Sequence, residues 1–362
     1  MIKEEKISIS ELNLLIIGFV FGGLAVTSPA KAAYQNAWLA QILSWIGGFI
    51  LVTIYLLIAK LNPKKTLTQM LKEHFGKYLG SIIGVLYIIF FIHFASLTMR
   101  IFGEYMVTVS FIETPTVFVI CFAFLPITYA LKNGIEIAAR VNQLIIPIMI
   151  FVIVLTILLS AKSFKYDNFL PFLEGGFLHV LKIGLRILSV SFGNMIVFLM
   201  IYPIVQEKKY IVKTTYLGVT IVGFVLLGVL VRDLLVLGPY MMSLQTFPPH
   251  ITLSLIPRAV IEPMVGVNLL IGVGIKVVVF IYCALLGITQ IFNLEDHKLL
   301  LLPVVTLVIS LSMWLHPNYP DLYRWVERNM VYYSLPFQVI IPCILLIISL
   351  IKNKTPSREE VS

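Results

Sequence analysis

A succession of long apolar blocks dominates this 362-residue sequence, and most of its charged residues lie in the short segments between the blocks. A helix of about 20 apolar residues spans the hydrocarbon core of a bilayer. Charged residues make up only 12% of the chain, roughly half the share of about 25% in soluble domains. The blocks lack the alternation of a membrane barrel. We predict a single, all-α integral membrane domain over residues 1–362.

Ten blocks are predicted to be transmembrane helices. They lie at residues 10–28, 38–60, 78–109, 115–132, 136–161, 184–206, 212–237, 265–292, 299–315 and 334–352. Three other stretches are expected to be ordered without spanning. Residues 66–75 form a short amphipathic helix on the inner surface, and the proline-rich stretch 239–263 is an outer loop with one short helix at most. Residues 316–332 mix aromatic and charged residues, as an interfacial segment does.

The distribution of positive charge predicts the orientation. With the N-terminus inside, 16 Lys and Arg residues fall in inner segments and nine in outer segments. This bias places both termini in the cytoplasm, with residues 353–362 as a cytoplasmic tail. The net charge of +9 is spread between the apolar blocks, so we expect no nucleic-acid partner. The partner that all of these segments require is the lipid bilayer.

Two predicted helices contain small and polar residues that favour a break in the helix. The first has Gly22, Gly23 and Thr27. The sixth has Ser189, Ser191, Gly193 and Asn194. Backbone groups released by such a break need a ligand, an ion or water as a partner. Alternatively, the small residues only allow close helix packing.

The positions of these two breaks suggest an internal repeat. Each break lies in the first helix of a set of five, so we predict a 5+5 inverted-repeat transporter-like fold with interrupted helices 1 and 6. The repeats would cover residues 7–161 and 184–352. In such folds the substrate site lies near the middle of the membrane, at the breaks. Backbone N–H groups exposed at a broken helix end favour an anion, so an amino acid carboxylate suits the site.

Three of the charged residues inside the apolar blocks are candidates for a functional role. Lys276 is 11 residues into its helix, near the middle of the membrane, where an unpaired charge costs several kcal/mol. It would replace a bound sodium ion or hold unwound carbonyls of helix 1; the alternative is a structural ion pair. Arg100 and Glu104 are one turn apart and can pair on one face, as a gate above the site or as an interfacial pair.

Other polar residues are candidates for lining the ligand site. They are Tyr105, Tyr282, Thr289 and Gln290. Pockets combine apolar walls with a few polar groups, but each of these residues also suits ordinary packing. The sequence has no phosphate loop, zinc-binding histidine pair or nucleophile elbow. We therefore expect no enzyme activity, catalytic residue, metal or cofactor.

Matches spread along the chain resemble the spore germination permease family, which comprises the B subunits of nutrient germinant receptors and belongs to the amino acid–polyamine–organocation transporter superfamily. The matching residues are Ile7-Ser8, Glu11-Leu12, Trp38, Pro63, Gly76, Thr114-Pro115, Tyr129, Gly134, Glu136, Arg140, Pro147, Asn168, Leu170-Pro171, Gly175, Phe247-Pro248, Glu262, Lys276, Gly287 and Pro303. The sequence departs from the family pattern at Asn36, Asn194 and Pro263. At Asn194 members often have a glutamate, so its loss puts a shared ion-coupling step in doubt.

The resemblance implies an amino-acid transporter fold that is used as a receptor. Such a subunit binds a small nutrient, often an amino acid, in the spore inner membrane, and it works with an A subunit and a C lipoprotein subunit to trigger germination. An ion-coupled amino acid transporter is the main alternative, because one fold can serve several functions. A channel for ions or water is a third.

Overall fold

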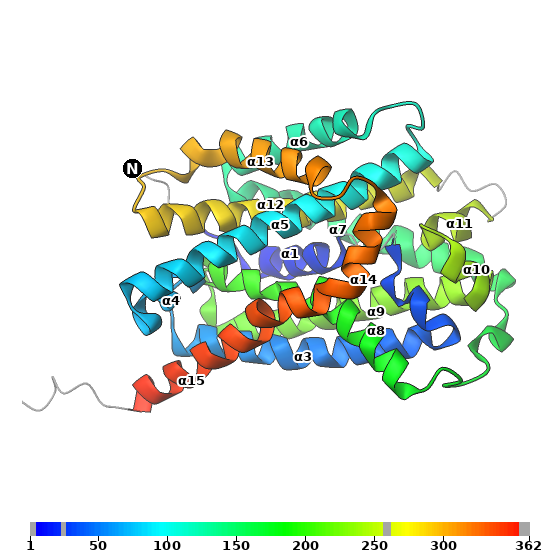
Figure 1. Cartoon of the computed structure of the whole chain (residues 1–362), viewed down its shortest axis with the longest axis horizontal. Coiled ribbons are helices and arrows are strands. Elements are labelled where there is room, and N and C mark those ends of the chain that lie inside the picture. Colours follow the sequence, from blue (N-terminus) through cyan, green and yellow to red (C-terminus); the bar gives the residue numbers. More distant parts are fainter. Residues whose placement is uncertain (1–4, 23–26, 256–261, 355–362) are drawn as a thin grey trace, which may run out of the picture.

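The structure is a computed structural model that describes residues 5–22, 27–255 and 262–354. Its helices pack side by side as an elongated bundle with the long helices roughly along its length (Figure 1). Eight helical segments of the described chain are long and apolar enough to cross a membrane, and two shorter apolar helices, Ile9–Phe21 and Lys298–Trp314, accompany them. Each of the ten predicted blocks corresponds to one of these segments. The all-α membrane fold is therefore confirmed, whereas the number of crossings and the internal repeat stay predictions.

The main helices of the first half follow the predicted order. They are α1 (Ile9–Phe21), α3 (Ala37–Leu61), α4 (Leu67–Phe75), α5 (Lys77–Val109), α6 (Thr116–Asn133) and α7 (Ile135–Ser160), with the 3₁₀ helix η1 (Pro29–Asn36) before α3. The predicted short helix at 66–75 is confirmed as α4. Thr66 caps it, because its side chain accepts a hydrogen bond from the backbone of Gln69 while the Gln69 side chain reciprocates.

The second half differs from the prediction in two stretches. Its helices are α8 (Phe177–Val190), α9 (Ile211–Leu237), α10 (Pro239–Leu244), α11 (Pro248–Ser254), α12 (Glu262–Phe292), α13 (Leu301–Trp314), α14 (Tyr319–Leu335) and α15 (Ile341–Lys354), with the 3₁₀ helices η4 (Phe192–Met200), η5 (Tyr202–Ile204) and η6 (Lys208–Tyr210) after α8. The stretch 239–263 contains two short helices, α10 and α11. Each begins with proline, which the first turn of a helix tolerates because its backbone nitrogen needs no hydrogen-bond partner there. The prediction of one helix at most was wrong there.

The predicted interfacial segment 316–332 is also helical. Asn318 caps α14 through a hydrogen bond from the backbone N–H of Asp321. A π-helical segment, η8 (Pro336–Ile340), joins α14 to α15. The polar residues of α14 therefore belong to a helix that continues into the last apolar block and packs against α8.

Burial separates inner helices from outer ones. In the most apolar 18-residue stretch of Phe177–Met200 and of Leu269–Phe292, 78% of the residues are buried, whereas the share is 28% in Thr116–Asn133. On α6 the large apolar side chains of Phe118, Phe122 and Leu125 are exposed, as expected for a face in contact with lipid tails. The inner helices α1, α5, α8 and α12 position the candidate site.

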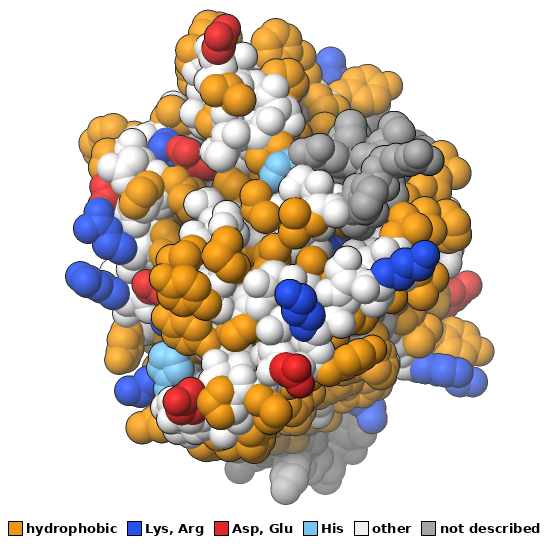
Figure 2. Space-filling view, turned by 90° about the vertical axis from the view of Figure 1, so that its right-hand side faces the viewer, with side chains coloured by type: hydrophobic (Ala, Val, Ile, Leu, Met, Phe, Trp, Pro, Cys, Tyr) orange, Lys and Arg blue, Asp and Glu red, His pale blue; other side chains and the backbone are white. Residues whose placement is uncertain are grey.

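The two ends of the bundle differ in charge. The first described residues and the end of α15 lie at the same end, together with α4 (Figure 1). At the opposite end, near α10 and α11, basic and acidic side chains are scattered among hydrophobic ones (Figure 2). The α4 end carries lysines of the α3–α4 connection and of η6. The first and last described residues thus share one side, which the prediction places in the cytoplasm.

Candidate functional site

The first helix loses its α-helical geometry where the sequence predicts. α1 ends at Phe21, and Gly22 caps it through a 2.9 Å bond from its N–H to the Gly18 carbonyl. The chain is helical again in η1, which is a 3₁₀ helix. Helix 1 is therefore not one continuous helix over 10–28. Gly23, the second predicted glycine of this break, lies outside the described residues.

Gly22 faces a neighbouring helix rather than open space. A methyl group on Gly22 would lie 2.2 Å from the Gly272 carbonyl oxygen and 3.1 Å from Cβ of Lys276. Its small size therefore permits close contact between α1 and α12, as the packing alternative predicts. The contact also places the broken end of α1 beside Lys276.

The sixth helix changes geometry at Ser191. α8 ends at Val190, Ser191 has φ −111° and ψ −94°, and the chain continues as η4. The Asn194 N–H bonds to the Ser191 carbonyl at 3.2 Å, in the 3₁₀ pattern. The Val190 carbonyl instead accepts hydrogen bonds from Nζ of Lys276 at 2.9 Å and from Nδ2 of Asn194 at 3.0 Å.

Lys276 therefore connects the two breaks. Its Nζ lies 5.6 Å from the ring centroid of Phe19 in α1, a cation–π distance, while it binds Val190 of α8. The side chain is 4% exposed, and within the described part of the chain no carboxylate lies at ion-pair distance from it. This carbonyl belongs to helix 6, where η4 leaves the acceptor without an α-helical partner. A contact between Lys276 and carbonyls of helix 1 stays a prediction, because residues 23–26 lie outside the described residues.

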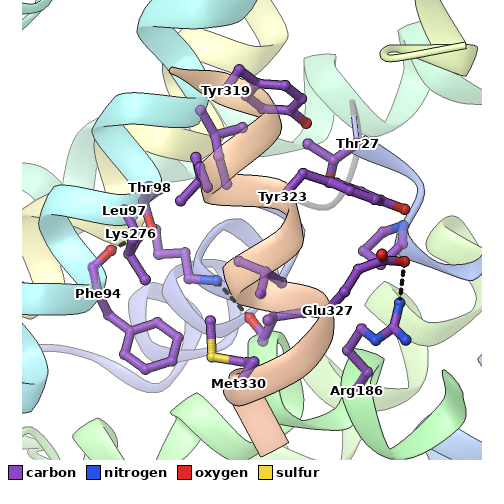
Figure 3. A pocket seen from close by; sticks show the side chains of 15 residues that line it. Thr27, Phe94, Leu97, Thr98, Arg186, Lys276, Tyr319, Tyr323, Glu327 and Met330 are labelled. Carbon is purple, nitrogen blue, oxygen red and sulfur yellow. Dashed lines mark hydrogen bonds and ion pairs between the residues drawn. The ribbon is translucent and has the colours of Figure 1, made fainter. Parts of the chain in front are cut away.

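A pocket surrounds Lys276 and opens between α5, α8, α14 and the start of η1 (Figure 3). About 730 Å³ of it, including space open to the outside, is not filled by protein atoms. Its lining comprises Thr27, Pro29, Phe94, Leu97, Thr98, Ile101, Arg186, Val190, Lys276, Tyr319, Leu322, Tyr323, Val326, Glu327 and Met330. Apolar walls with a few polar groups are typical of small-molecule sites. Of the predicted site residues, the structure brings Thr27 and Lys276 into this pocket.

A second charged feature of the pocket is an ion pair between α8 and α14. Nη1 of Arg186 lies 2.9 Å from Oε1 of Glu327, and Figure 3 shows this pair on a different wall from the amine of Lys276. Lys31 of η1 lies nearby, with Nζ 5.1 Å from the Tyr323 ring centroid. The pocket thus contains both a buried cation and a carboxylate between cations.

Three predicted residues of helix 6 bind protein groups instead of lining this pocket. Nε2 of Gln338 donates to Oδ1 of Asn194 at 2.9 Å and to the Ser189 carbonyl at 2.8 Å. The Tyr55 hydroxyl donates its one hydrogen between two carbonyls, that of Gln338 at 2.7 Å and that of Gly193 at 3.1 Å. This buried network ties the η4 break to the π-helical segment η8 and to α3. A ligand contact for these residues stays a prediction.

The hydroxyls of helix 6 are bound within their own helix. Oγ of Ser191 donates to the Ile187 carbonyl at 2.6 Å, and Oγ of Ser189 donates to the Leu185 carbonyl at 2.9 Å. Such bonds to a preceding turn satisfy a buried serine and often bend the helix. They agree with the change of geometry at Ser191.

The other predicted lining residues lie away from Lys276. Tyr105 packs edge-on against Phe247 near α11. The Tyr282 hydroxyl donates to Glu5. Thr289 bonds back to its own helix, and Oε1 of Gln290 accepts a 2.6 Å bond from Thr66. Thr289 is 13 residues beyond Lys276, which corresponds to about 20 Å along the helix. Tyr282, Thr289 and Gln290 therefore lie on the part of α12 that runs toward the α4 end.

The Arg100–Glu104 pair is confirmed as a contact. Nη2 of Arg100 lies 2.7 Å from Oε1 of Glu104. Nη1 also faces the Ser312 carbonyl at 3.4 Å, and Nη2 faces the Pro317 carbonyl at 3.5 Å. The guanidinium therefore ties α5 to the α13–α14 connection. A role as a gate stays a prediction.

The sequence interpretation missed Arg186, Tyr323, Glu327 and Gln338 as site residues. Arg186 was counted only as an outer charge. Tyr319, Tyr323 and Glu327 are four residues apart and so share one face of α14. This four-residue spacing could have indicated a helix face that lines a pocket. The prediction of an interfacial segment overlooked it.

The fold and the pocket together define a multi-pass α-helical membrane protein whose bundle contains a largely apolar pocket with a buried lysine. The sequence model described as "Spore germination protein" matches residues 6–320. The chain therefore belongs to the spore germination protein family, also called the spore permease family.

Individual relatives support this membership. Spore germination protein KB of Bacillus subtilis (strain 168) is 26% identical over 369 aligned positions, covering 99% of this chain and 98% of the relative. Spore germination protein YndE of the same organism is 24% identical, covering 83% and 85%. Spore germination protein A2 is 31% identical but covers only 59% and 58%. The similarity to the first of these extends over nearly all of both chains, so it includes the helices that form the pocket.

Proposed function

We propose that the chain is the germinant-sensing subunit of a spore nutrient receptor. It binds a small nutrient, an amino acid, in the pocket around Lys276 and triggers germination together with A and C partner subunits in the spore inner membrane. Family membership supports the role in germination. The pocket geometry supports the ligand class. The proposed role involves no chemical reaction, so we expect no enzyme activity.

The observation that carries the proposal is the bond between Lys276 and the Val190 carbonyl at the break in helix 6. Among the described residues the amine has one hydrogen-bond partner, the Val190 carbonyl, but an ammonium has three donor positions. A ligand carboxylate in the pocket would bind the same amine with both partners charged, whereas the Val190 carbonyl is a neutral acceptor. It would thereby weaken or replace the contact with Val190.

This competition gives the ligand a way to act on the protein. A ligand shifts a conformational equilibrium only through its different affinities for the two states. A carboxylate that draws Lys276 away from the Val190 carbonyl favours a state with a different backbone geometry at the junction of α8 and η4. The network of Gln338, Asn194 and Tyr55 would pass that change to α3 and α15, from which partner subunits could sense it.

The ammonium group of an amino acid would bind Glu327. This carboxylate already pairs with Arg186 at 2.9 Å, so it can accept further hydrogen bonds through its other lone pairs. The apolar walls of α5 and α14 would hold the ligand side chain. Glu327→Gln is therefore expected to weaken amino acid binding about tenfold or more and to leave binding of a simple carboxylate such as propionate unchanged.

The transporter alternative and the receptor proposal both use the broken helices α1 and α8. A functional assay is therefore needed to distinguish a transporter from a sensor. The purified chain would be placed in liposomes, and uptake of a panel of labelled L-amino acids would be measured beside their effect on thermal unfolding. Stabilisation without uptake supports the sensor. Stabilisation with uptake would establish the transporter instead, and the absence of stabilisation by any amino acid would refute the proposed ligand class.

A further inference from the structure

A second cavity lies at the α4 end of the bundle, well away from Lys276. It is formed by the last turn of α3, the α3–α4 connection, η5, η6 and the start of α9. About 1040 Å³ of space, including part that is open to the outside, is not filled by atoms. Five lysines line it: Lys60, Lys64, Lys65, Lys208 and Lys209.

The lysines give this cavity a strong positive charge. Among the described residues that surround it, only Lys65 is neutralised, by Glu73 at 2.6 Å. Glu207, which precedes Lys208 in the chain, is exposed and is not a lining residue. Several like charges around one cavity repel one another, and an anion placed among them would remove that repulsion.

The rest of the lining is apolar. Leu56, Leu199 and Ile211 form walls of the cavity. Val212 also lines it, and this residue is 40% exposed on the outside of the bundle beside Tyr210. The cavity thus joins a basic region to a surface of the kind that faces lipid. A soluble anion would use only the lysines, whereas a lipid would use both parts.

We propose that this cavity binds the phosphate headgroup of an anionic phospholipid, with the acyl chains along the outer surface of α9. Basic pockets between membrane helices bind such headgroups, and each nearby Lys contributes to the attraction. The lining includes Leu199 and Tyr202, which belong to η4 and η5, the continuation of the broken sixth helix. A bound lipid would hold the far end of that segment in place. The inference does not depend on the proposed nutrient ligand.

The test compares lipids and variants in the purified chain. Thermal unfolding in detergent would be followed during titration with phosphatidylglycerol, phosphatidylcholine or inorganic phosphate. We expect phosphatidylglycerol to raise the unfolding temperature, with little effect of the other two. In the Lys208→Gln/Lys209→Gln variant, binding should be roughly 30-fold weaker, because two lysines near the phosphate are lost. The matched control, Lys77→Gln/Lys132→Gln, removes two lysines that lie outside the cavity, and it should bind like the wild type.

Three results would overturn the proposal: equal stabilisation by the two lipids, equal loss in the two double variants, or reproduction of the effect by inorganic phosphate, which indicates a soluble-anion site. Native mass spectrometry of the wild-type chain gives a readout that needs no variant. There, retention of phosphatidylglycerol over phosphatidylcholine is expected, and equal retention would contradict the inference.

Discussion

Replacement of Lys276 by methionine should change stability and ligand binding in opposite directions. Methionine preserves the length of the side chain but removes the charge. In the protein the amine donates a hydrogen bond to the Val190 carbonyl, worth about 1.5–3 kcal/mol. It also has a cation–π contact with Phe19, worth about 1–2 kcal/mol. Burial of an ion costs several kcal/mol even after relaxation. The cost is similar to or exceeds these gains, so we expect Lys276→Met to raise the free energy of unfolding by about 0–3 kcal/mol.

Ligand binding should weaken in the same variant. A charge-assisted bond to a ligand carboxylate is worth about 1.5–3 kcal/mol, so affinity for an amino acid should fall by roughly 10- to 150-fold. Thermal unfolding with amino acid titration measures both quantities, and spores that carry the variant should assemble it but not respond to the nutrient. A less stable variant with unchanged affinity would show that Lys276 is structural and would refute this reasoning.

Three further perturbations test other parts of the structure. Gly22→Ala should lower the free energy of unfolding by about 1–3 kcal/mol through overpacking against the facing helix. Gly274→Ala is the control and should be tolerated, because no heavy atom lies within 4 Å of the added methyl group. Denaturant unfolding of both variants measures the difference, and equal stability would contradict the expectation. Gln338→Leu should cost about 1–3 kcal/mol because Asn194 loses its buried partner, and an unchanged unfolding temperature would contradict this. The pKa of His74 lies below its usual 6.5 because of burial and then nearby Lys352, so the folded chain binds the proton less than the unfolded chain. Stability should therefore fall as the pH drops below about 6.5, and His74→Gln should lessen that fall.

The fold was largely predictable because bilayer thickness limits the length of each apolar block. All ten predicted blocks correspond to helical segments. The boundaries of α1 and of α14 were harder to place. An apolar stretch does not reveal where backbone hydrogen bonding changes to a 3₁₀ pattern, as it does at Ser191, and aromatic residues with charges suit either an interfacial segment or a pocket wall.

The site was predictable only in part. Lys276 could be identified because a charge inside an apolar block is costly, and Gly22 because glycines favour a break or close contact. Its partner, the Val190 carbonyl, could not be identified, since any backbone carbonyl gives the same sequence signal. Glu327 and Gln338 depend on how α14 and η8 pack against α8, which a single sequence does not specify.

The bond from Lys276 to the sixth helix has a thermodynamic consequence. Its amine is covalently attached to α12, so it cannot leave for the other side of the membrane as a bound metal ion could. Its occupancy of this position therefore does not vary with external salt. A receptor built around it would respond to the concentration of its ligand without drawing on a metal-ion gradient at this position.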